Sequence, residues 1–269
     1  LPDPSVTGQL VTINYTVATA IGTPTGNVTV ADGLGGSCVA AVGAGSCSIA
    51  FATAGARTLT ATYAGDATFA TSASAGTPHP VDPAPTTTSI TADLPDPSVT
   101  GEAVPVNFTV ISTGGTPTGT VNVTDGVTSC SASVAVGTCN LAFPTVGART
   151  VTATYVGDAN FAGSASAGQS HLVNPAGTTT TISGHLPDPS TTSTAVTVTW
   201  TVLPSAPGAG TPTGLVTVTD GVDSCNAAVA AGGCTLTLTT SGTRSLVATY
   251  AGDTEFSGSS SAGTAHEVN

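Results

Sequence analysis

The sequence predicts an all-β fold made of three tandem β-sandwiches of about seven strands each, arranged as an extended rod. Three observations predict it. One set of motifs recurs three times along the 269 residues. Apolar and polar residues alternate along most of each copy, which is the period of a strand with one buried face. Gly, Pro, Asn and Asp interrupt these stretches, and no stretch shows the period of a helix.

The repeat has a period of about 92 residues, set by the segment Leu-Pro-Asp-Pro-Ser that begins at Leu1, Leu94 and Leu186. Later landmarks keep one order in every copy: Gly-Thr-Pro-Thr-Gly, Asp-Gly, two cysteines, and Ala-Thr-Tyr-x-Gly-Asp-x-x-Phe. A period of this length is a whole domain, so each copy is expected to bury its own core. We expect domains at residues 1–83, 84–175 and 176–269.

The first long strand of each copy shows the alternation most clearly. Its apolar residues sit at every second position and are expected to face the space between two sheets. These residues are Val11, Ile13, Tyr15 and Val17, then Val104, Val106, Phe108 and Val110, then Val196, Val198, Trp200 and Val202. The aromatic residue falls at the same step each time and is expected in the core.

A Thr-rich segment precedes the second and third copies, at residues 83–91 and 175–183, and is expected to form the first strand of each. The first copy has no such segment, and the chain stops at Asn269, where the next one would begin. We therefore expect the first domain to lack its first strand and the sequence to be a window from a longer array. The alternative is that another chain supplies the strand, as in donor-strand fibres, because an edge left unpaired favours such pairing.

The combined motifs resemble a known family. They read G-x-x-V-x-x-x-(aromatic)-T-V, then G-T-P-T-G-x-V-x-V-x-D-G, then A-T-Y-x-G-D-x-x-F-x-x-S-x-S-A. This pattern is similar to the bacterial immunoglobulin-like repeats of large surface and secreted proteins, the group called bacterial Ig-like domain 3. The resemblance implies Ig-like sandwiches that serve as spacers, stalks and fibre units, some with adhesive ends. The third copy departs from it at Ser193, which stands where the others have Gly8 and Gly101.

The six cysteines allow fifteen pairings, but the repeat favours one pair within each copy. The expected disulfides are Cys38 with Cys47, Cys130 with Cys139, and Cys225 with Cys234. The eight intervening residues, with Gly near the turn, predict a β-hairpin whose cross-strand positions carry the bridge. Disulfides indicate an oxidising compartment, so the protein is expected to be extracellular. Zinc bound by two thiolates per copy and one distant His is disfavoured.

The only cations are three arginines at one repeating position, Arg57, Arg149 and Arg244. We interpret them as structural ion pairs, because an Arg fork is readily satisfied by a nearby carboxylate. The alternative is a guanidinium that faces a ligand. Two series of candidate partners exist, Asp32, Asp125 and Asp220, or Asp66, Asp158 and Asp253.

The other polar residues indicate turns rather than a catalytic or metal site. His79, His171 and His266 repeat at one position, and His185 stands alone in a junction. Calcium at a junction is an alternative, but Asp3, Asp96 and Asp188 are isolated between prolines and no Asp-x-Asp-x-Asp-Gly loop exists. The motifs G-x-S-x-G, H-E-x-x-H and a phosphate loop are absent. We therefore predict no enzyme, no cofactor and no metal.

The charge excludes several partners. Three Lys and Arg against fifteen Asp and Glu give a net charge of -12, too few cations to hold nucleic acid or an anionic membrane. Apolar runs are also far too short for a membrane span.

The leading functional hypothesis is a non-catalytic structural segment of an extracellular filament or cell-surface stalk, with neighbouring repeats or chains as partners. Its Pro-bearing junctions are typical of semi-rigid spacers. The alternative is an adhesive module whose end loops bind a glycan or a surface protein. A spacer attached to an enzyme domain is a third hypothesis.

Overall fold

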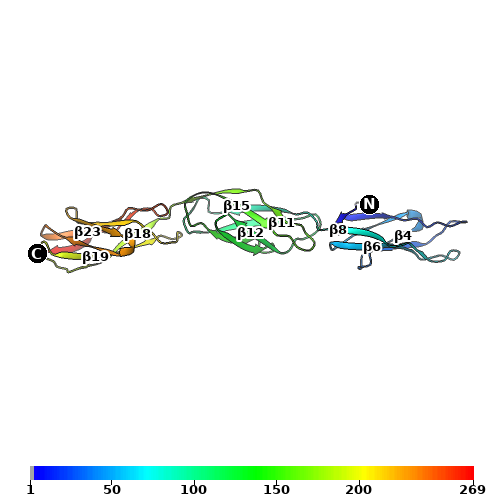
Figure 1. The fold of residues 1–269 in the computed structure, drawn as a ribbon, viewed down its shortest axis with the longest axis horizontal. Helices are drawn as coiled ribbons and strands as arrows, with labels where there is room; N and C mark the ends of the chain where they lie inside the picture. The colour runs from blue at the N-terminus through cyan, green and yellow to red at the C-terminus, as the bar shows by residue number, and fades with distance from the viewer. Residues whose placement is uncertain (1–2) are drawn as a thin grey trace.

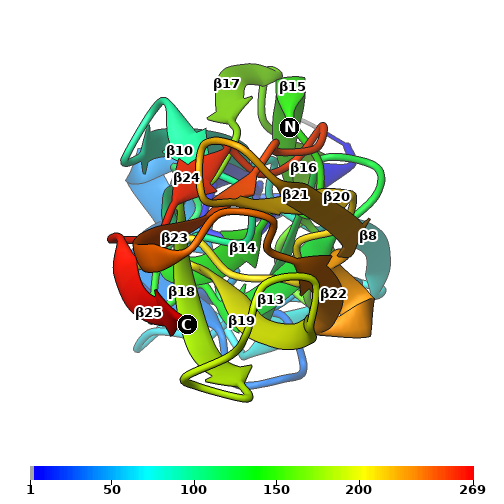
Figure 2. The same cartoon turned by 90° about the vertical axis from the view of Figure 1, so that its left-hand side faces the viewer.

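A computed structural model describes residues 3–269 as three β-sandwiches placed end to end in a long, thin rod (Figure 1). Viewed along the rod, the sandwiches project onto one another, so they follow one common axis (Figure 2). Within the described residues the only helical segments are two 3-10 turns, η1 (Val42–Ala44) and η2 (Val229–Ala231). No helix of this part of the chain has the length and hydrophobicity needed to cross a membrane.

The middle sandwich shows the complete arrangement. One sheet has the order β10-β17-β15-β12-β13, with β16 beside β15, and the other has the order β14-β11-β9. Seven of its strands have five residues or more, which confirms the predicted sandwich of about seven strands. The strands are β9 (Thr87–Asp93), β10 (Ser98–Val99), β11 (Ala103–Ile111), β12 (Thr120–Thr124), β13 (Ser129–Ser133), β14 (Thr138–Ala142), β15 (Gly147–Tyr155), β16 (Ser164–Ala165) and β17 (Gln169–Asn174).

The third sandwich repeats this plan, with one sheet ordered β18-β19-β22 and the other β21-β20-β23-β24, where β25 also pairs with β23. A parallel bridge between Ser190 and Val268 takes the place of the short strand β10. The strands are β18 (Thr178–Leu186), β19 (Ala195–Pro204), β20 (Leu215–Thr219), β21 (Ser224–Ala228), β22 (Gly233–Thr237), β23 (Gly242–Tyr250), β24 (Ser259–Ser260) and β25 (Thr264–Val268).

The core of each sandwich consists of the inward residues of the alternating strands. In β11 the burial alternates without a break, and Val104, Val106, Phe108 and Val110 are all buried. They belong to one hydrophobic cluster with Val121, Leu141, Val151 and Tyr155 from strands of both sheets. Fully burying one such side chain contributes about 1.5–3 kcal/mol, so the alternation of the sequence accounts for the stability of the sandwich.

The first sandwich has a smaller second sheet. Its strands are β1 (Ser5–Val6), β2 (Leu10–Asn14), β3 (Asn27–Ala31), β4 (Ser37–Ala41), β5 (Ser46–Ala50), β6 (Gly55–Tyr63), β7 (Ser72–Ala73) and β8 (Thr77–Asp82). In the described chain β2 pairs only with β5, whereas β11 pairs with both β14 and β9. β2 is also only 5 residues long, against 9 for β11, because its second half has no partner that holds it in a ladder.

The open side of β2 leaves a cavity of about 470 Å³. Its walls include Tyr15, Val17, Ala61 and Ser72. Val17 and Ala61 are only partly buried, although the matching Val and Ala of the other two sandwiches are buried. The first strand of a complete sandwich therefore covers residues that the first sandwich leaves partly open.

The hairpin predicted for the cysteine segments is wrong. β4 pairs with β3 in one sheet and β5 pairs with β2 in the other, so the Cys38–Cys47 disulfide joins the two sheets. Between these strands the chain forms η1 and then passes through Gly45, whose φ of 69° is in the left-handed region. This turn carries the chain across the core instead of folding it back in one sheet. The other two disulfides, Cys130–Cys139 and Cys225–Cys234, join the sheets in the same way.

The unpaired edge generates a first prediction. In native-state hydrogen exchange of the whole chain, the amides of β2 should exchange faster than those of the equivalent strands β11 and β19. The reason is that only one side of β2 is held in a ladder, so it opens at a lower free energy. Equal protection of β2 and β11 at matched pH and temperature would contradict this, and β5 against β14 serves as the control pair.

Candidate functional site

Three polar clusters recur in the sandwiches and contain most of the charged residues. The first is a loop clamp built on Asp253. Its Oδ2 accepts hydrogen bonds from the backbone N–H and the hydroxyl of Thr213 at 2.7 and 2.6 Å. Its Oδ1 accepts the N–H groups of Glu255 and Phe256, both at 2.8 Å. This carboxylate therefore ties the Gly-Thr-Pro-Thr-Gly loop to the loop that follows Tyr250.

The same clamp occurs in the other sandwiches, with Asp66 on Thr25 and Asp158 on Thr118. Desolvation opposes ionisation of Asp158 and Asp253, but the hydrogen bonds from the Thr residue and from the backbone outweigh it and lower the pKa of each carboxyl to about 2. The pKa of Asp66 is lowered as well, chiefly by the backbone N–H groups of Thr25 and Thr68. These three carboxylates do not contact the arginines. The second candidate series therefore ties loops together instead of pairing with the arginines.

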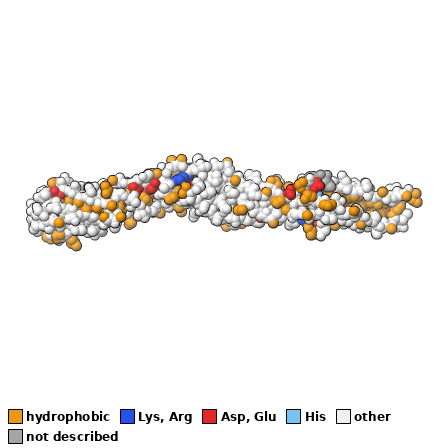
Figure 3. All heavy atoms as spheres, viewed as in Figure 1, with side chains coloured by type: hydrophobic (Ala, Val, Ile, Leu, Met, Phe, Trp, Pro, Cys, Tyr) orange, Lys and Arg blue, Asp and Glu red, His pale blue; other side chains and the backbone are white. Residues whose placement is uncertain are grey.

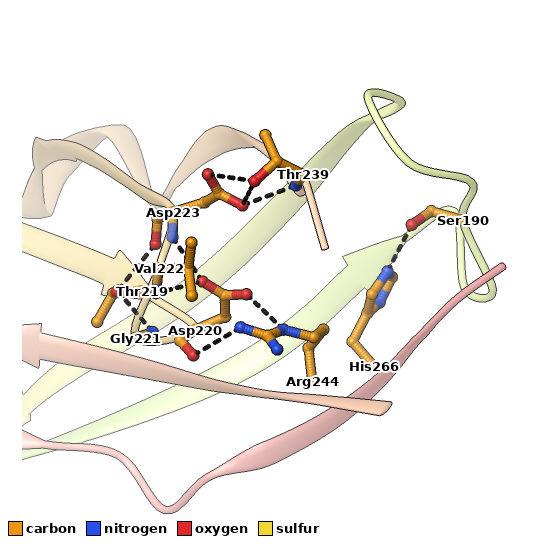
Figure 4. A network of polar contacts seen from close by, with 9 residues as sticks. All are labelled: Ser190, Thr219, Asp220, Gly221, Val222, Asp223, Thr239, Arg244 and His266. Atoms are coloured by element: carbon orange, nitrogen blue, oxygen red, sulfur yellow. Dashed lines mark hydrogen bonds and ion pairs between the residues drawn. The ribbon is translucent and has the colours of Figure 1, made fainter. Parts of the chain in front are cut away.

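The second cluster is the Arg–Asp pair, which the structure forms with the first candidate series (Figure 4). Arg244 Nε lies 2.6 Å from Asp220 Oδ2, while Asp220 Oδ1 accepts the N–H groups of Val222 and Asp223. Burial works against the charge of Asp220, but these backbone hydrogen bonds and Arg244 together lower its pKa. In the other sandwiches, Arg57 lies 3.5 Å from Asp32 and Arg149 lies 3.8 Å from Asp125.

The third cluster surrounds the repeating histidine, here His171 on β17. Its Nε2 lies 2.8 Å from the hydroxyl of Ser98. Its Nδ1 lies 3.3 Å from Asp93 at the end of β9 and 3.8 Å from Asp96 in the Leu-Pro-Asp-Pro loop. Burial raises the pKa of Asp93, and the nearby His171 acts against this rise.

The third sandwich has a related cluster with a second imidazole. His266 on β25 meets the hydroxyl of Ser190 through Nε2 at 2.9 Å. Its Nδ1 lies 3.0 Å from Nδ1 of His185 on β18 and 3.4 Å from Asp188. Burial lowers the pKa of His266, with Asp188 acting in the opposite sense and His185 in the same sense.

Sequence reasoning missed this cluster. His185, interpreted as an isolated junction residue, occupies the position that Asp93 occupies one repeat earlier. The signal was present in the repeat, because positions 93 and 185 both carry ligand-type residues at the same sequence separation from the Leu-Pro-Asp-Pro aspartate. In the first sandwich, the described residues of the cluster are His79, Ser5 at 2.8 Å from its Nε2 and Asp3 at 3.6 Å from its Nδ1.

The order Ser98, His171, Asp93 is that of a Ser-His-Asp catalytic triad, but burial argues against acyl transfer. Ser98 is 0% exposed and His171 is 2% exposed. A nucleophile needs a site about 3 Å away where the reacting carbon can sit, and full burial shields the Ser98 hydroxyl from a substrate in solvent. The Ser–His contact instead fixes the orientation of the imidazole ring.

The sandwiches meet through a repeated set of contacts, which we call the joint. Val6 of the first sandwich packs against the core of the second, and Val99 of the second packs against the core of the third. Gly8 approaches the backbone of Gly114 so closely that a Cβ on Gly8 would overlap its carbonyl group. The joint therefore depends on the absence of a side chain at this position.

The second joint has the same plan, and hydrogen bonds cross both joints: in the first, the N–H of Ala54 donates to Oδ1 of Asn160 at 3.0 Å. A Cβ on Gly101 would overlap the carbonyl group of Ala209, whose N–H donates to the carbonyl of Thr100 at 3.1 Å. Glu255 of the third sandwich accepts the N–H of Val146 in the second at 2.6 Å. Because apolar packing and backbone hydrogen bonds act together, the joint holds neighbouring sandwiches in a defined orientation.

The ion pair can be tested in the third sandwich, where Trp200 is the single tryptophan of the chain and reports local unfolding. We expect Arg244→Ala to lower the stability of this sandwich by about 2 kcal/mol, because it leaves the buried Asp220 carboxylate without its cation. The measurement is urea unfolding followed by Trp200 fluorescence. Arg149→Ala, the same change in the middle sandwich, is the control and should leave the Trp200 transition unchanged. If Arg244→Ala unfolds at the same urea concentration as the wild type, the structural role of the Arg244–Asp220 pair is contradicted.

The loop clamp predicts a pH dependence. The folded pKa of Asp253, about 2, lies below its unfolded value of about 3.9. Its stabilising effect is therefore complete above about pH 4 and is lost as the pH falls towards 2. We expect Asp253→Asn to lower the Trp200 unfolding midpoint at pH 7 by the equivalent of about 1 kcal/mol, since water screens part of the interaction. The difference from wild type should shrink below pH 3. A constant difference between pH 7 and pH 2 would refute the assignment.

A family model described as bacterial Ig-like domain (group 3) matches residues 1–82, 90–174 and 183–269. A search of curated proteins finds no match to the chain.

Solved structures similar to the chain include the fibronectin(III)-like modules of Clostridium thermocellum CbhA, at 18% identity and a TM-score of 0.27, covering 68% of this chain and 93% of that one. The Escherichia coli adhesin FdeC matches at 15% identity and a TM-score of 0.27, covering 100% of this chain and 95% of its own. Three N-terminal domains of the bacteriophage RB49 outer capsid protein Hoc match at 13% identity and a TM-score of 0.29, with 99% and 95% covered. The assignment rests on the family model, which matches every copy of the repeat: the chain belongs to the bacterial Ig-like domain (group 3) family.

Proposed function

We propose that the chain is a non-catalytic structural segment of an extracellular filament or cell-surface stalk. The observation that carries this proposal is the joint, because the same contacts connect the first sandwich to the second and the second to the third. A joint that repeats keeps the long axes of successive sandwiches in one line (Figure 1). The family and the three disulfides support an extracellular location.

The surface also supports a structural role. Charged side chains form small, separate groups on the face drawn in Figure 3. No aromatic side chain of residues 3–269 is exposed. Recognition surfaces concentrate Tyr, Trp and Arg, so this surface is poor in the residues that dominate binding energy.

Adhesion through end loops is the alternative function. Its best support is Ile21, 83% exposed, and Leu34, 69% exposed, in loops of the first sandwich. These residues lie before and after β3, at opposite ends of the sandwich. An adhesive surface would bring its apolar loop residues to one end, so this distribution favours the structural role.

Neighbouring repeats are the partners that the proposal requires. The open edge of β2 supports this, because it offers the side chains that a strand with the sequence pattern of β9 contacts in a complete sandwich. In the middle sandwich, Ile90 of β9 stands opposite Phe108, and the hydroxyl of Thr88 meets that of Ser164 at 2.7 Å. The first sandwich offers Tyr15 and Ser72 at the corresponding positions, with Ser72 exposed. A Thr-rich strand with this pattern would therefore complete the sandwich.

The joint provides the decisive experiment. Gly101→Ser places a side chain against the backbone of Ala209, so the second and third sandwiches should no longer align. Ser193 adopts a φ of 63° at the equivalent position, which indicates that Ser is compatible with the local backbone. In electron micrographs and X-ray scattering of the whole chain, we expect the wild type to be a straight rod and Gly101→Ser to be bent at one joint with a reduced maximum dimension.

Gly126→Ser is the matched control, since Gly126 also has a positive φ but nothing lies within 4 Å of its added Cβ. A variant Gly101→Ser as straight as wild type would show that the joint does not hold the rod. In native extracellular material, antibody labelling along the length of filaments is expected. Labelling restricted to filament tips, together with glycan binding by the purified chain, would instead support the adhesive function.

A further inference from the structure

We propose that His185, Asp188 and His266 of the third sandwich bind a divalent transition-metal ion of the zinc class, and that Asp93, Asp96 and His171 form a second, weaker site in the middle sandwich. In each set, one ligand atom from every residue lies within 4.8 Å of the others. Imidazole nitrogen and carboxylate oxygen are ligands that zinc uses in proteins, and two His with one carboxylate is a common set.

The distances in the third sandwich fit a tetrahedral ion. Ligand atoms bound at about 2.0–2.1 Å in a tetrahedral arrangement lie about 3.3–3.4 Å from one another. The Nδ1 atoms of His185 and His266 are 3.0 Å apart. Oxygens of Asp188 lie 3.4 Å from His266 Nδ1 and 3.7 Å from His185 Nδ1. Each imidazole thus faces a different oxygen of Asp188, Oδ1 for His266 and Oδ2 for His185, and these spacings leave space between the three groups for one small cation.

The histidine ring is held ready for coordination. Ser190 contacts Nε2 of His266 at 2.9 Å, and His266 is 1% exposed, so the ring is fixed with Nδ1 directed towards His185 and Asp188. A polar group that fixes the other nitrogen in this way is the usual outer-shell partner of a metal-bound histidine. Ser98 makes the same contact with His171 at 2.8 Å in the middle sandwich.

The middle sandwich supplies an independent observation. Asp93 Oδ2 and His171 Nδ1 are both buried and neither has a hydrogen-bond partner, although they lie only 3.3 Å apart. A buried carboxylate oxygen and a buried imidazole nitrogen without partners are costly, and a cation between them would satisfy both. With one imidazole and two carboxylates, this site is expected to bind a transition metal less tightly than the site with two imidazoles.

The substitution between repeats keeps a metal-ligating residue type at this position, although the donor atom changes from oxygen to nitrogen. Asp93 and His185 occupy the same position, and both residue types coordinate zinc. An ion can enter from solvent, because the side chains of Asp96 and Asp188 are 32% and 36% exposed. This open side also leaves room for a water molecule as a further ligand.

The site would connect three distant parts of each sandwich. Its ligands come from the first strand, from the Leu-Pro-Asp-Pro loop and from the last strand, as in β18, Asp188 and β25. Metal bound only by the folded state stabilises that state through mass action, so the ion would hold the first strand against the rest of the sandwich. The first sandwich has only Asp3 and His79 of this set in the described chain, which makes it an internal control.

The test is zinc titration of the whole oxidised chain, followed by isothermal calorimetry and by Trp200 fluorescence during thermal unfolding. We expect two zinc ions per chain, a tighter and a weaker one, and an increase in the Trp200 unfolding temperature. All cysteines of the described chain are in disulfides, so no thiolate competes for the metal.

Two variants separate the sites. Asp188→Asn retains an oxygen that can accept the N–H of Glu267, a contact of 3.2 Å in the native protein, and should therefore fold. It should weaken the tighter site by at least about 100-fold and abolish the zinc-dependent shift of the Trp200 transition. His185→Gln should have the same effect. Asp96→Asn should remove only the weaker site and leave the Trp200 shift intact.

Asp3→Asn is the matched control in the first sandwich and should change neither site. The proposal is overturned if wild-type protein shows no zinc binding and no shift of the Trp200 transition. It is also overturned if Asp188→Asn and His185→Gln, folded by circular dichroism, bind zinc as wild type does. A shift produced by calcium and not by zinc would replace the proposed ion class with an oxygen-ligated cation and would equally refute the proposal.

Discussion

The pairing of the first strand with the long strand beside it is the interaction on which the rest of each complete sandwich depends. β9 along β11, and β18 along β19, extend the second sheet to three strands and cover the aromatic side chain at its centre. The same strand brings Asp93 or His185 to the repeating histidine. Ala84, just before β9, lies against Gly114 in the joint. Core, polar cluster and joint are thus linked through one segment, and the first sandwich shows the consequence where β2 stands without it.

Much of the fold was predictable because its causes are local. The alternation from Val104 to Val110 determines both the strand and its buried face, and the repeat transfers this result to the other copies. The cysteine partners followed from the repeat too, but their geometry did not. Whether two neighbouring segments pair with each other or enter different sheets depends on the turn through Gly45, whose direction is set by packing on both sides.

The candidate clusters were harder to predict, because they combine residues that are distant in sequence. The choice between Asp220 and Asp253 as partner of Arg244 depends on the register of β20 against β23. His185 and His266 meet only because the first and last strands of one sandwich lie at the same end. Secondary-structure propensity and hydrophobic periodicity carry no information about such long-range contacts. The repeat did contain a signal, because Asp93 of one copy is replaced by His185 in the next.

The positions of the three arginines have a further consequence for an extracellular protein. Each lies inside a nine-residue strand, β6, β15 or β23, and stands opposite a histidine of the neighbouring strand. The chain contains no other Lys or Arg, so these are the only peptide bonds that a trypsin-like protease recognises. Such a protease must draw an extended segment into its own cleft, and a segment held within a sheet is not free to enter. Degradation by this class of enzyme therefore requires a sandwich to open first, and its rate follows the population of the opened state.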